Sequence, residues 1–241
     1  MLQQLRQWLR RRRDPAADWQ EVAGWCEQRR LGFQAAADGQ GFAVQGRTGS
    51  MGWRLDWGPP ERLYVRGREL RLRADLGLPE ELHLMVLDRA LQQDLERAVV
   101  DRVTGLAPSR PDPDMPAEMR WVAAFPRLAP ADAGDLRVRY ESVASHKEWL
   151  MAWVGGELGR SLLAPPAVNR SPLLLMIGGG RVQLRTALDN PTPAALEPWV
   201  TLFEQALREA RRVHKEMGDP GEPTTLPSLW AVSSEEGGPG R

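Results

Sequence analysis

The sequence has few of the features that mark a secreted, membrane-spanning or disulfide-bonded protein. Cys26 is the only cysteine in 241 residues, so neither an intrachain disulfide nor a cysteine-based metal cage can form. No stretch approaches the roughly 18 apolar residues that a membrane-spanning helix needs. The first residues, MLQQLRQWLRRRR, lack the apolar core and the cleavage site of a secretory signal. These absences predict a cytoplasmic protein, because a reducing compartment keeps a lone thiol free.

The known catalytic and cofactor-binding motifs are also missing. His83, His146 and His214 lie far apart in the sequence and do not have the spacing of a zinc motif. The chain has no GxSxG nucleophile elbow and no strand followed by GxGxxG. The loop 46–52, GRTGSMG, lacks the lysine of a phosphate-binding loop. No catalytic residue, metal ligand or cofactor is therefore predicted, and the sequence leans against enzymatic activity.

Positive charge is carried almost entirely by arginine. The 32 basic and 32 acidic residues give a formal net charge of zero, so the whole chain has no general attraction to nucleic acid. Only Lys147 and Lys215 are lysines. This bias has two interpretations: a GC-rich genome, or arginine-based recognition of carboxylate or phosphate groups.

The stretch 53–73, WRLDWGPPERLYVRGRELRLR, has the most clearly specified structure in the chain. Its apolar and charged residues alternate, and the period of two directs them to opposite faces of short strands. The residues predicted to face the core are Trp53, Leu55, Trp57, Leu70 and Leu72. The residues predicted for the outer face are Arg54, Asp56, Glu69, Arg71 and Arg73.

The three arginines of that outer face, Arg54, Arg71 and Arg73, are a candidate interaction surface. Nucleic-acid binding would require exposed aromatic rings beside the arginines, for stacking on bases. Here the tryptophans lie on the opposite face, and Asp56 and Glu69 reduce the positive charge. The pattern therefore favours a protein partner over nucleic acid.

The remaining periodicities predict an α+β fold, with small antiparallel hairpin sheets packed against helices. Helices are predicted where apolar residues recur every three to four positions: 2–12, 18–30, 80–103, 145–163 and 193–217. Gly32 is predicted to end the second of these helices. Strands are predicted where apolar residues alternate between turn signals: 33–37, 42–45, 53–57, 63–65, 69–73, 136–140, 173–177 and 181–188.

The chain divides into two weakly repeated halves. The predicted segments are a basic N-terminal helix (1–13), an N-terminal α+β half (14–103), a proline-rich linker (104–118), a C-terminal α+β half (119–217) and a tail (218–241). In each half a strand, 69–73 or 181–185, is followed by a proline-containing loop and a helix rich in leucine. The two units either share one sheet or form two lobes with a ligand cleft between them.

Both terminal segments carry apolar residues that are candidates for intermolecular contact. In the first segment Leu5, Trp8 and Leu9 share one helix face, and five arginines flank them without an acidic residue before Asp14. This helix docks either on protein or on an anionic membrane surface. In the tail, Leu229 and Trp230 lie in the apolar patch LPSLWAV, which either folds back on the chain or docks on another protein.

The segments WRLDWGPPERLYVRGRELRLR and EMRWVAAFPRL resemble parts of an uncharacterised proteobacterial family of hypothetical proteins, over residues 19–215. This resemblance implies a bacterial, cytoplasmic protein and brings no activity, cofactor or catalytic residue.

Three functional hypotheses follow. The leading one is a non-enzymatic protein-interaction or assembly subunit with a protein partner or self-association. The alternatives are a peripheral membrane protein held by residues 1–13, and a small-ligand-binding or enzymatic protein that uses a cleft between lobes.

Overall fold

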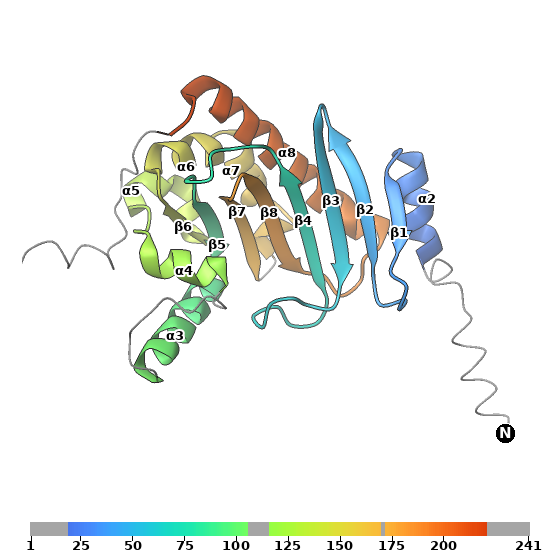
Figure 1. The fold of residues 1–241 in the computed structure, drawn as a ribbon, viewed down its shortest axis with the longest axis horizontal. Coiled ribbons are helices and arrows are strands. Elements are labelled where there is room, and N and C mark those ends of the chain that lie inside the picture. The colour runs from blue at the N-terminus through green and yellow to red at the C-terminus, as the bar shows by residue number, and fades with distance from the viewer. Residues whose placement is uncertain (1–18, 106–115, 170–171, 221–241) are drawn as a thin grey trace, which may run out of the picture.

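A single antiparallel sheet of eight strands organises the protein. The computed structural model describes residues 19–105, 116–169 and 172–220. All neighbouring strands are antiparallel, and their order is β1-β2-β3-β4-β8-β7-β5-β6. Figure 1 shows helices on both sides of this sheet. The predicted α+β fold class is confirmed.

The strands occupy both halves of the chain. Their bounds are β1 Gly32–Ala35, β2 Phe42–Thr48, β3 Met51–Gly58, β4 Glu69–Asp75, β5 Leu84–Asp88, β6 Tyr140–Ala144, β7 Leu173–Gly178 and β8 Arg181–Ala187. The α-helices are α2 Gln20–Gln28, α3 Arg89–Gly105, α4 Ala117–Ala124, α5 Pro130–Ala133, α6 Lys147–Val154, α7 Glu157–Leu162 and α8 Pro193–Met217. Two short 3₁₀ helices are η2 Gly134–Val138 and η3 Ala167–Asn169.

One face of the sheet is covered along its length by α2, α6, α7 and α8, which form the main core with it. Alternate strand residues point into this layer, as Leu55, Leu72 and Leu184 show: they lie side by side on β3, β4 and β8 and are at most 1% exposed. The amphipathic helix α8 buries Trp199 and Phe203 against them. Apolar burial of this extent is the main source of stability for the fold.

The other face is divided into an apolar part and a charged part. Over β5, β6 and β7, α3 and α4 bury a second cluster that includes Met85, Trp121 and Met176. Over β2, β3, β4 and β8 the outward residues are mostly charged, and Figure 1 shows no described helix on this part. We call the outward side of these four strands the charged face.

Three predicted elements are wrong in type. The predicted helix 80–103 is strand β5 followed by α3. The run Leu84–Asp88 is buried at every residue because it lies between β7 and β6 with helices on both faces. A short continuous apolar run of this kind does not distinguish a buried strand from a helix. The predicted strand 63–65 is part of a turn, and 136–138 belongs to η2, with β6 beginning at Tyr140.

Two predicted helices also differ in extent from the helices of the structure. The predicted helix 145–163 is divided into α6 and α7 by Gly155 and Gly156, and Gly156 has a φ of 64° that favours glycine. The helix α2 ends before the predicted position: Gly32 is the first residue of β1, and the chain leaves the helix at Arg30.

The two predicted halves share one sheet. Strand β5 of the first half lies between β7 and β6 of the second, and β4 pairs with β8. The strands that resemble each other, 69–73 and 181–185, are direct neighbours in these pairs. The helices that follow them lie on opposite faces, α3 on one and α8 on the other, so the similarity does not extend to the packing.

Several predicted segments fall outside the described residues. These are the N-terminal helix 1–13, most of the linker 104–118 and the tail beyond residue 220. The interaction candidates Leu5, Trp8, Leu9, Leu229 and Trp230 lie in these segments. Within the described part of the chain, no helix combines the length and the hydropathy that a membrane crossing requires.

Candidate functional site

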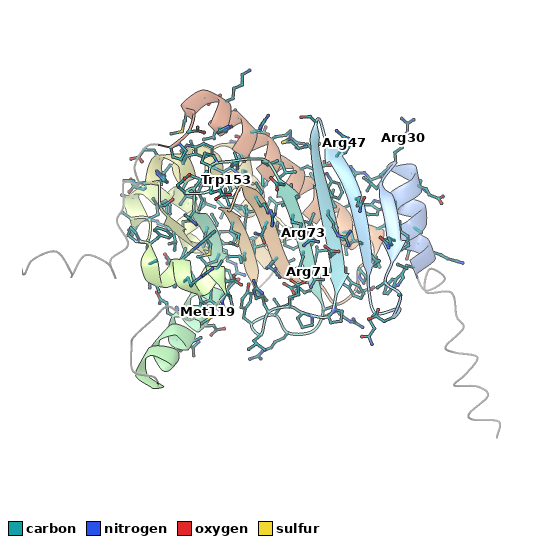
Figure 2. The ribbon with its side chains drawn as sticks, in the orientation of Figure 1. Arg30, Arg47, Arg71, Arg73, Met119 and Trp153 are labelled. Carbon is teal, nitrogen blue, oxygen red and sulfur yellow. The ribbon has the colours of Figure 1, made fainter. Side chains whose placement is uncertain are left out.

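The strand register builds the charged face as two rows of side chains across the sheet. In one row Gln45, Arg54, Arg73 and Gln183 are consecutive partners on β2, β3, β4 and β8. In the second row, Asp56 pairs with Arg71, and Arg71 pairs with Arg185. Figure 2 shows Arg71 and Arg73 along β4, with Arg47 near the end of the neighbouring hairpin. The predicted arginines Arg54, Arg71 and Arg73 therefore lie together, on the face opposite Trp53 and Trp57.

The second row is an ion-pair network around a buried carboxylate. Glu69 is fully buried, and its carboxylate accepts hydrogen bonds from the guanidinium of Arg185 at 2.7 Å and from the backbone N–H of Glu61 at 2.6 Å. Arg71 lies 3.6 Å from Glu69 and 3.1 Å from the exposed Glu61. Burial opposes the charge on Arg185, but the hydrogen bond and the charge of Glu69 outweigh this and raise the pKa of the guanidinium. This network neutralises the centre of the charged face.

A second buried carboxylate ties the loop after β3 to helix α4. Glu118 accepts hydrogen bonds from the Arg62 guanidinium at 2.5 Å and from the Tyr64 hydroxyl at 2.8 Å. Burial, and then the charge and hydrogen bond of Glu118, raise the pKa of the Tyr64 phenol above its ordinary range. Glu118 is 1% exposed and both of its partners come from the loop after β3, so we interpret the contact as structural.

The end of the charged face near the α2–β1 turn is a shallow pocket of about 930 Å³. We call it the arginine pocket. Its arginines are Arg29, Arg30, Arg47, Arg54, Arg73 and Arg181. Among the described lining residues, Asp75 is the only carboxylate. Side chains from the α2–β1 turn, β2, β3, β4 and β8 thus converge on one positively charged hollow, although the chain as a whole is neutral.

Four of these six arginines have carboxylate partners. Arg29 pairs with Glu197, Arg54 and Arg73 share Asp56 at 2.8 and 3.5 Å, and Arg181 lies 3.5 Å from Asp75. Three carboxylates therefore pair with four of the six guanidinium groups. Within the described residues, Arg30 and Arg47 form no ion pair with a carboxylate. The excess charge of the pocket is concentrated at these two positions.

Arg30 holds an unusual backbone position at the rim of the pocket. The N–H groups of Leu31 and Arg30 donate to the carbonyl groups of Cys26 and Glu27, at 2.8 and 3.1 Å. This pair of bonds is the Schellman motif, whose left-handed residue is usually glycine. Arg30 has a φ of 57° and is the only non-glycine residue with positive φ in the described ranges. An arginine therefore stands where the helix end favours glycine.

One serine–histidine pair resembles a nucleophile with its base, but its surroundings do not support that chemistry. The Ser145 hydroxyl lies 2.8 Å from Nδ1 of His146 and accepts the N–H of His83 at 3.0 Å. It also lies 3.2 Å from the carbonyl oxygen of Glu81. Ser145 is 1% exposed, so substrate has no access to the hydroxyl. We interpret this pair as the link between β6 and the segment before β5.

His83 contributes to the same packing. Its ring lies edge-on to Trp121 and stacks on Phe125, with ring centres 4.8 and 5.4 Å apart, respectively. Burial lowers the pKa of His83. In the described part of the chain, no three His, Cys, Asp or Glu side chains are grouped to hold a metal ion.

Sequence reasoning missed most of the arginine pocket. Arg29, Arg30, Arg47 and Arg181 are separated by up to 152 positions, and only strand order brings them to one end of the sheet. Part of the signal was present, since Arg181 and Arg185 have the same alternation as Arg71 and Arg73. Two arginines of the 61–68 loop make other contacts: Arg62 binds Glu118, and Arg68 lies over the ring of Trp57.

No family model, no curated protein and no solved structure matches this chain.

Proposed function

We propose that this protein is a non-enzymatic protein-interaction subunit of a bacterial complex and that it docks its partner on the charged face. The observation that carries the proposal is the asymmetric cover of the sheet. One face and half of the other are covered by helices, whereas β2, β3, β4 and β8 present arginines outward. Such a surface suits charge-directed recognition, which sets specificity and association rate.

The composition of the charged face supports binding over catalysis. Its buried carboxylate Glu69 is fully enclosed and already accepts hydrogen bonds from Arg185 and from the backbone N–H of Glu61, so it is not presented to a substrate. The face also has no histidine or cysteine among the outward residues of β2, β3, β4 and β8. Guanidinium groups remain protonated, and their planar donor array suits carboxylate recognition.

The other two hypotheses gain less support. A ligand cleft between lobes requires two separate units, whereas both halves contribute strands to one sheet. Membrane association through residues 1–13 stays a prediction, because these residues lie outside the described part of the chain. A cytoplasmic location is part of the proposal and is supported by the single buried Cys26.

Site-specific photo-crosslinking in the native cells tests the docking surface. A photoreactive amino acid at Gln183, on the outward side of β8 and beside Arg73, should give a covalent adduct of one defined mass. The same amino acid at Glu216, on the exposed side of α8, should give no such adduct. Charge reversal at Arg47 and Arg73 should remove the Gln183 adduct because it replaces attraction with repulsion.

The matched control reverses two arginines on other surfaces. Arg97 and Arg160 each have 73% exposed side chains, compared with 60% for Arg73. Arg97→Glu with Arg160→Glu should leave the adduct intact. An adduct that forms equally from Glu216, or that survives reversal of Arg47 and Arg73, would contradict docking on the charged face.

A further inference from the structure

We propose that the arginine pocket binds an extended, acidic segment of the partner protein, with its carboxylates paired to Arg30, Arg47 and neighbouring arginines. This inference rests on the proposed function and adds the chemistry of the bound partner. The occupant is a peptide rich in Asp and Glu, crossing the strands from the α2–β1 turn towards β8. Charge, dimensions and backbone conformation each support it.

Charge complementarity is the first support. Four of the six guanidinium groups of the pocket share three carboxylates, and Arg30 and Arg47 have none within the described residues. Like charges gathered on one surface repel one another, and an anionic partner removes this repulsion. Arginine also pairs with a carboxylate through two parallel hydrogen bonds, which makes the contact directional.

The dimensions of the pocket favour an extended chain over a single small anion. Its lining reaches from Gly32 on β1 to Arg181 on β8, across four interstrand spacings. At about 4.8 Å for each spacing, this distance is about 19 Å. An extended peptide advances about 3.3 Å per residue, so about six residues cross the pocket. One phosphate or one carboxylate would contact only a small part of it.

The position of the pocket also distinguishes a peptide from other ligands. Small-molecule sites usually enclose most of the ligand within apolar walls. The arginine pocket instead lies open at one end of a sheet, and half of its lining residues are charged. Single-stranded nucleic acid binds on exposed aromatic rings. The outward positions of β2, β3, β4 and β8 carry no aromatic residue. Trp53 borders the pocket, but it is only 4% exposed and packs in the main core, so its ring has no free face on which a base could stack.

The backbone at Arg30 is an independent observation. A left-handed conformation is strained for a residue with a side chain and free of that strain for glycine. Residues that break a local conformational preference are concentrated at functional sites. Arg30 therefore keeps a less stable helix end and places a guanidinium group, without a carboxylate partner in the described residues, at the rim of the pocket.

The substitution Arg30→Gly separates binding from folding. It removes the guanidinium group and gives the helix end its preferred residue, so the urea midpoint of the variant should equal or exceed that of the parent chain. Binding should nevertheless weaken. A structural role for Arg30 alone would give the reverse result, a lower midpoint with unchanged binding, and would overturn the assignment.

The binding measurement uses the full chain and a fluorescein-labelled (Glu-Ser)₄ peptide, followed by fluorescence anisotropy. The dissociation constant should rise about fivefold for Arg30→Gly and about tenfold for Arg47→Glu, as expected for exposed charge pairs. It should rise further when the salt concentration is increased from about 50 to about 300 mM, because ions screen exposed charges. Arg97→Glu, on α3, is the matched control and should leave the constant unchanged.

Four results would overturn the inference. These are absence of peptide binding, equal binding of (Lys-Ser)₄, equal affinity in all variants, and tighter binding of an eight-residue oligothymidylate, which would assign the pocket to nucleic acid. Deletion of residues 221–241, which include Glu222, Glu235 and Glu236, tests a different occupant. A rise in peptide affinity on deletion would assign the pocket to the tail of this chain.

The two proposals can fail separately. If the Gln183 adduct forms but the peptide does not bind, the charged face docks a partner that lacks an acidic segment. If the peptide binds but no Gln183 adduct forms, the arginine pocket binds acidic peptides and the proposed docking function is lost.

Discussion

At the residue scale, burial distinguishes carboxylates of the charged face that look alike in the sequence. Glu69 has a fully buried side chain, whereas the Glu61 side chain is 53% exposed, although both contact Arg71 and Arg185. Water screens an exposed pair, so its net contribution is small. A buried charge that loses its partner is left without solvation and is costly. Replacement by glutamine should therefore lower the free energy of unfolding more at Glu69 than at Glu61.

The substitution Glu69→Gln should lower the free energy of unfolding by about 3 kcal/mol, because it removes the buried carboxylate beside the mostly buried charge of Arg185 and leaves only the exposed Glu61. Urea unfolding at pH 7 measures this change. The control Glu61→Gln should cost less than about 1 kcal/mol, since its partner arginines keep Glu69. Equal losses from the two substitutions would show that burial does not decide the strength of this network.

At the scale of single elements, close side-chain contact determines which glycines are replaceable. Gly46 on β2 pairs with Trp53 on β3, and a Cβ atom at Gly46 would overlap the Trp53 ring. Gly52 is the residue before Trp53 on β3, on the outward side, and a Cβ atom there meets no atom within 4 Å. The two glycines lie in the same hairpin, so they form a matched pair.

The substitution Gly46→Ala should therefore destabilise the protein by about 1–3 kcal/mol, because the Trp53 ring must move within a packed core. Gly52→Ala should change the free energy of unfolding by less than about 0.5 kcal/mol. Thermal or urea unfolding followed by tryptophan fluorescence gives both values. A neutral Gly46→Ala would mean that the core beside Trp53 is not tightly packed.

At the scale of the whole molecule, the order of the strands joins the two halves of the chain. Strand β5 belongs to residues 14–103, yet both of its neighbours, β6 and β7, come from residues 119–217. The main core likewise contains residues from both halves, including Leu55 and Trp199. Neither half can bury its apolar surface without the other.

The full chain should consequently unfold in a single transition, with near-ultraviolet and far-ultraviolet circular dichroism giving the same urea midpoint. A fragment of residues 14–103 should show no cooperative transition, because β4 and β5 lose their partners β8, β7 and β6. A fragment with a native-like near-ultraviolet spectrum would contradict this expectation and support separate domains.

Local patterns predicted much of the secondary structure and the shared face of Arg54, Arg71 and Arg73. The helix 193–217 agrees with α8, and both predicted hairpins are present as β1–β2 and β7–β8. The alternation in 53–57 placed Trp53 inside and Arg54 outside because a strand has a period of two. These properties depend on neighbouring residues alone, so they can be inferred without the fold.

By itself the sequence thus determined the α+β class, the phase of strands 53–57 and 69–73, and the outward direction of Arg54, Arg71 and Arg73. Only the tertiary structure decided that β5 is a strand, because its apolar run has no periodicity and its burial comes from elements distant in sequence. The arginine pocket likewise depends on strand order, which brings Arg30, Arg47 and Arg181 to one end of the sheet. Pairing between distant segments is a global property, since it depends on how the whole chain buries its apolar surface.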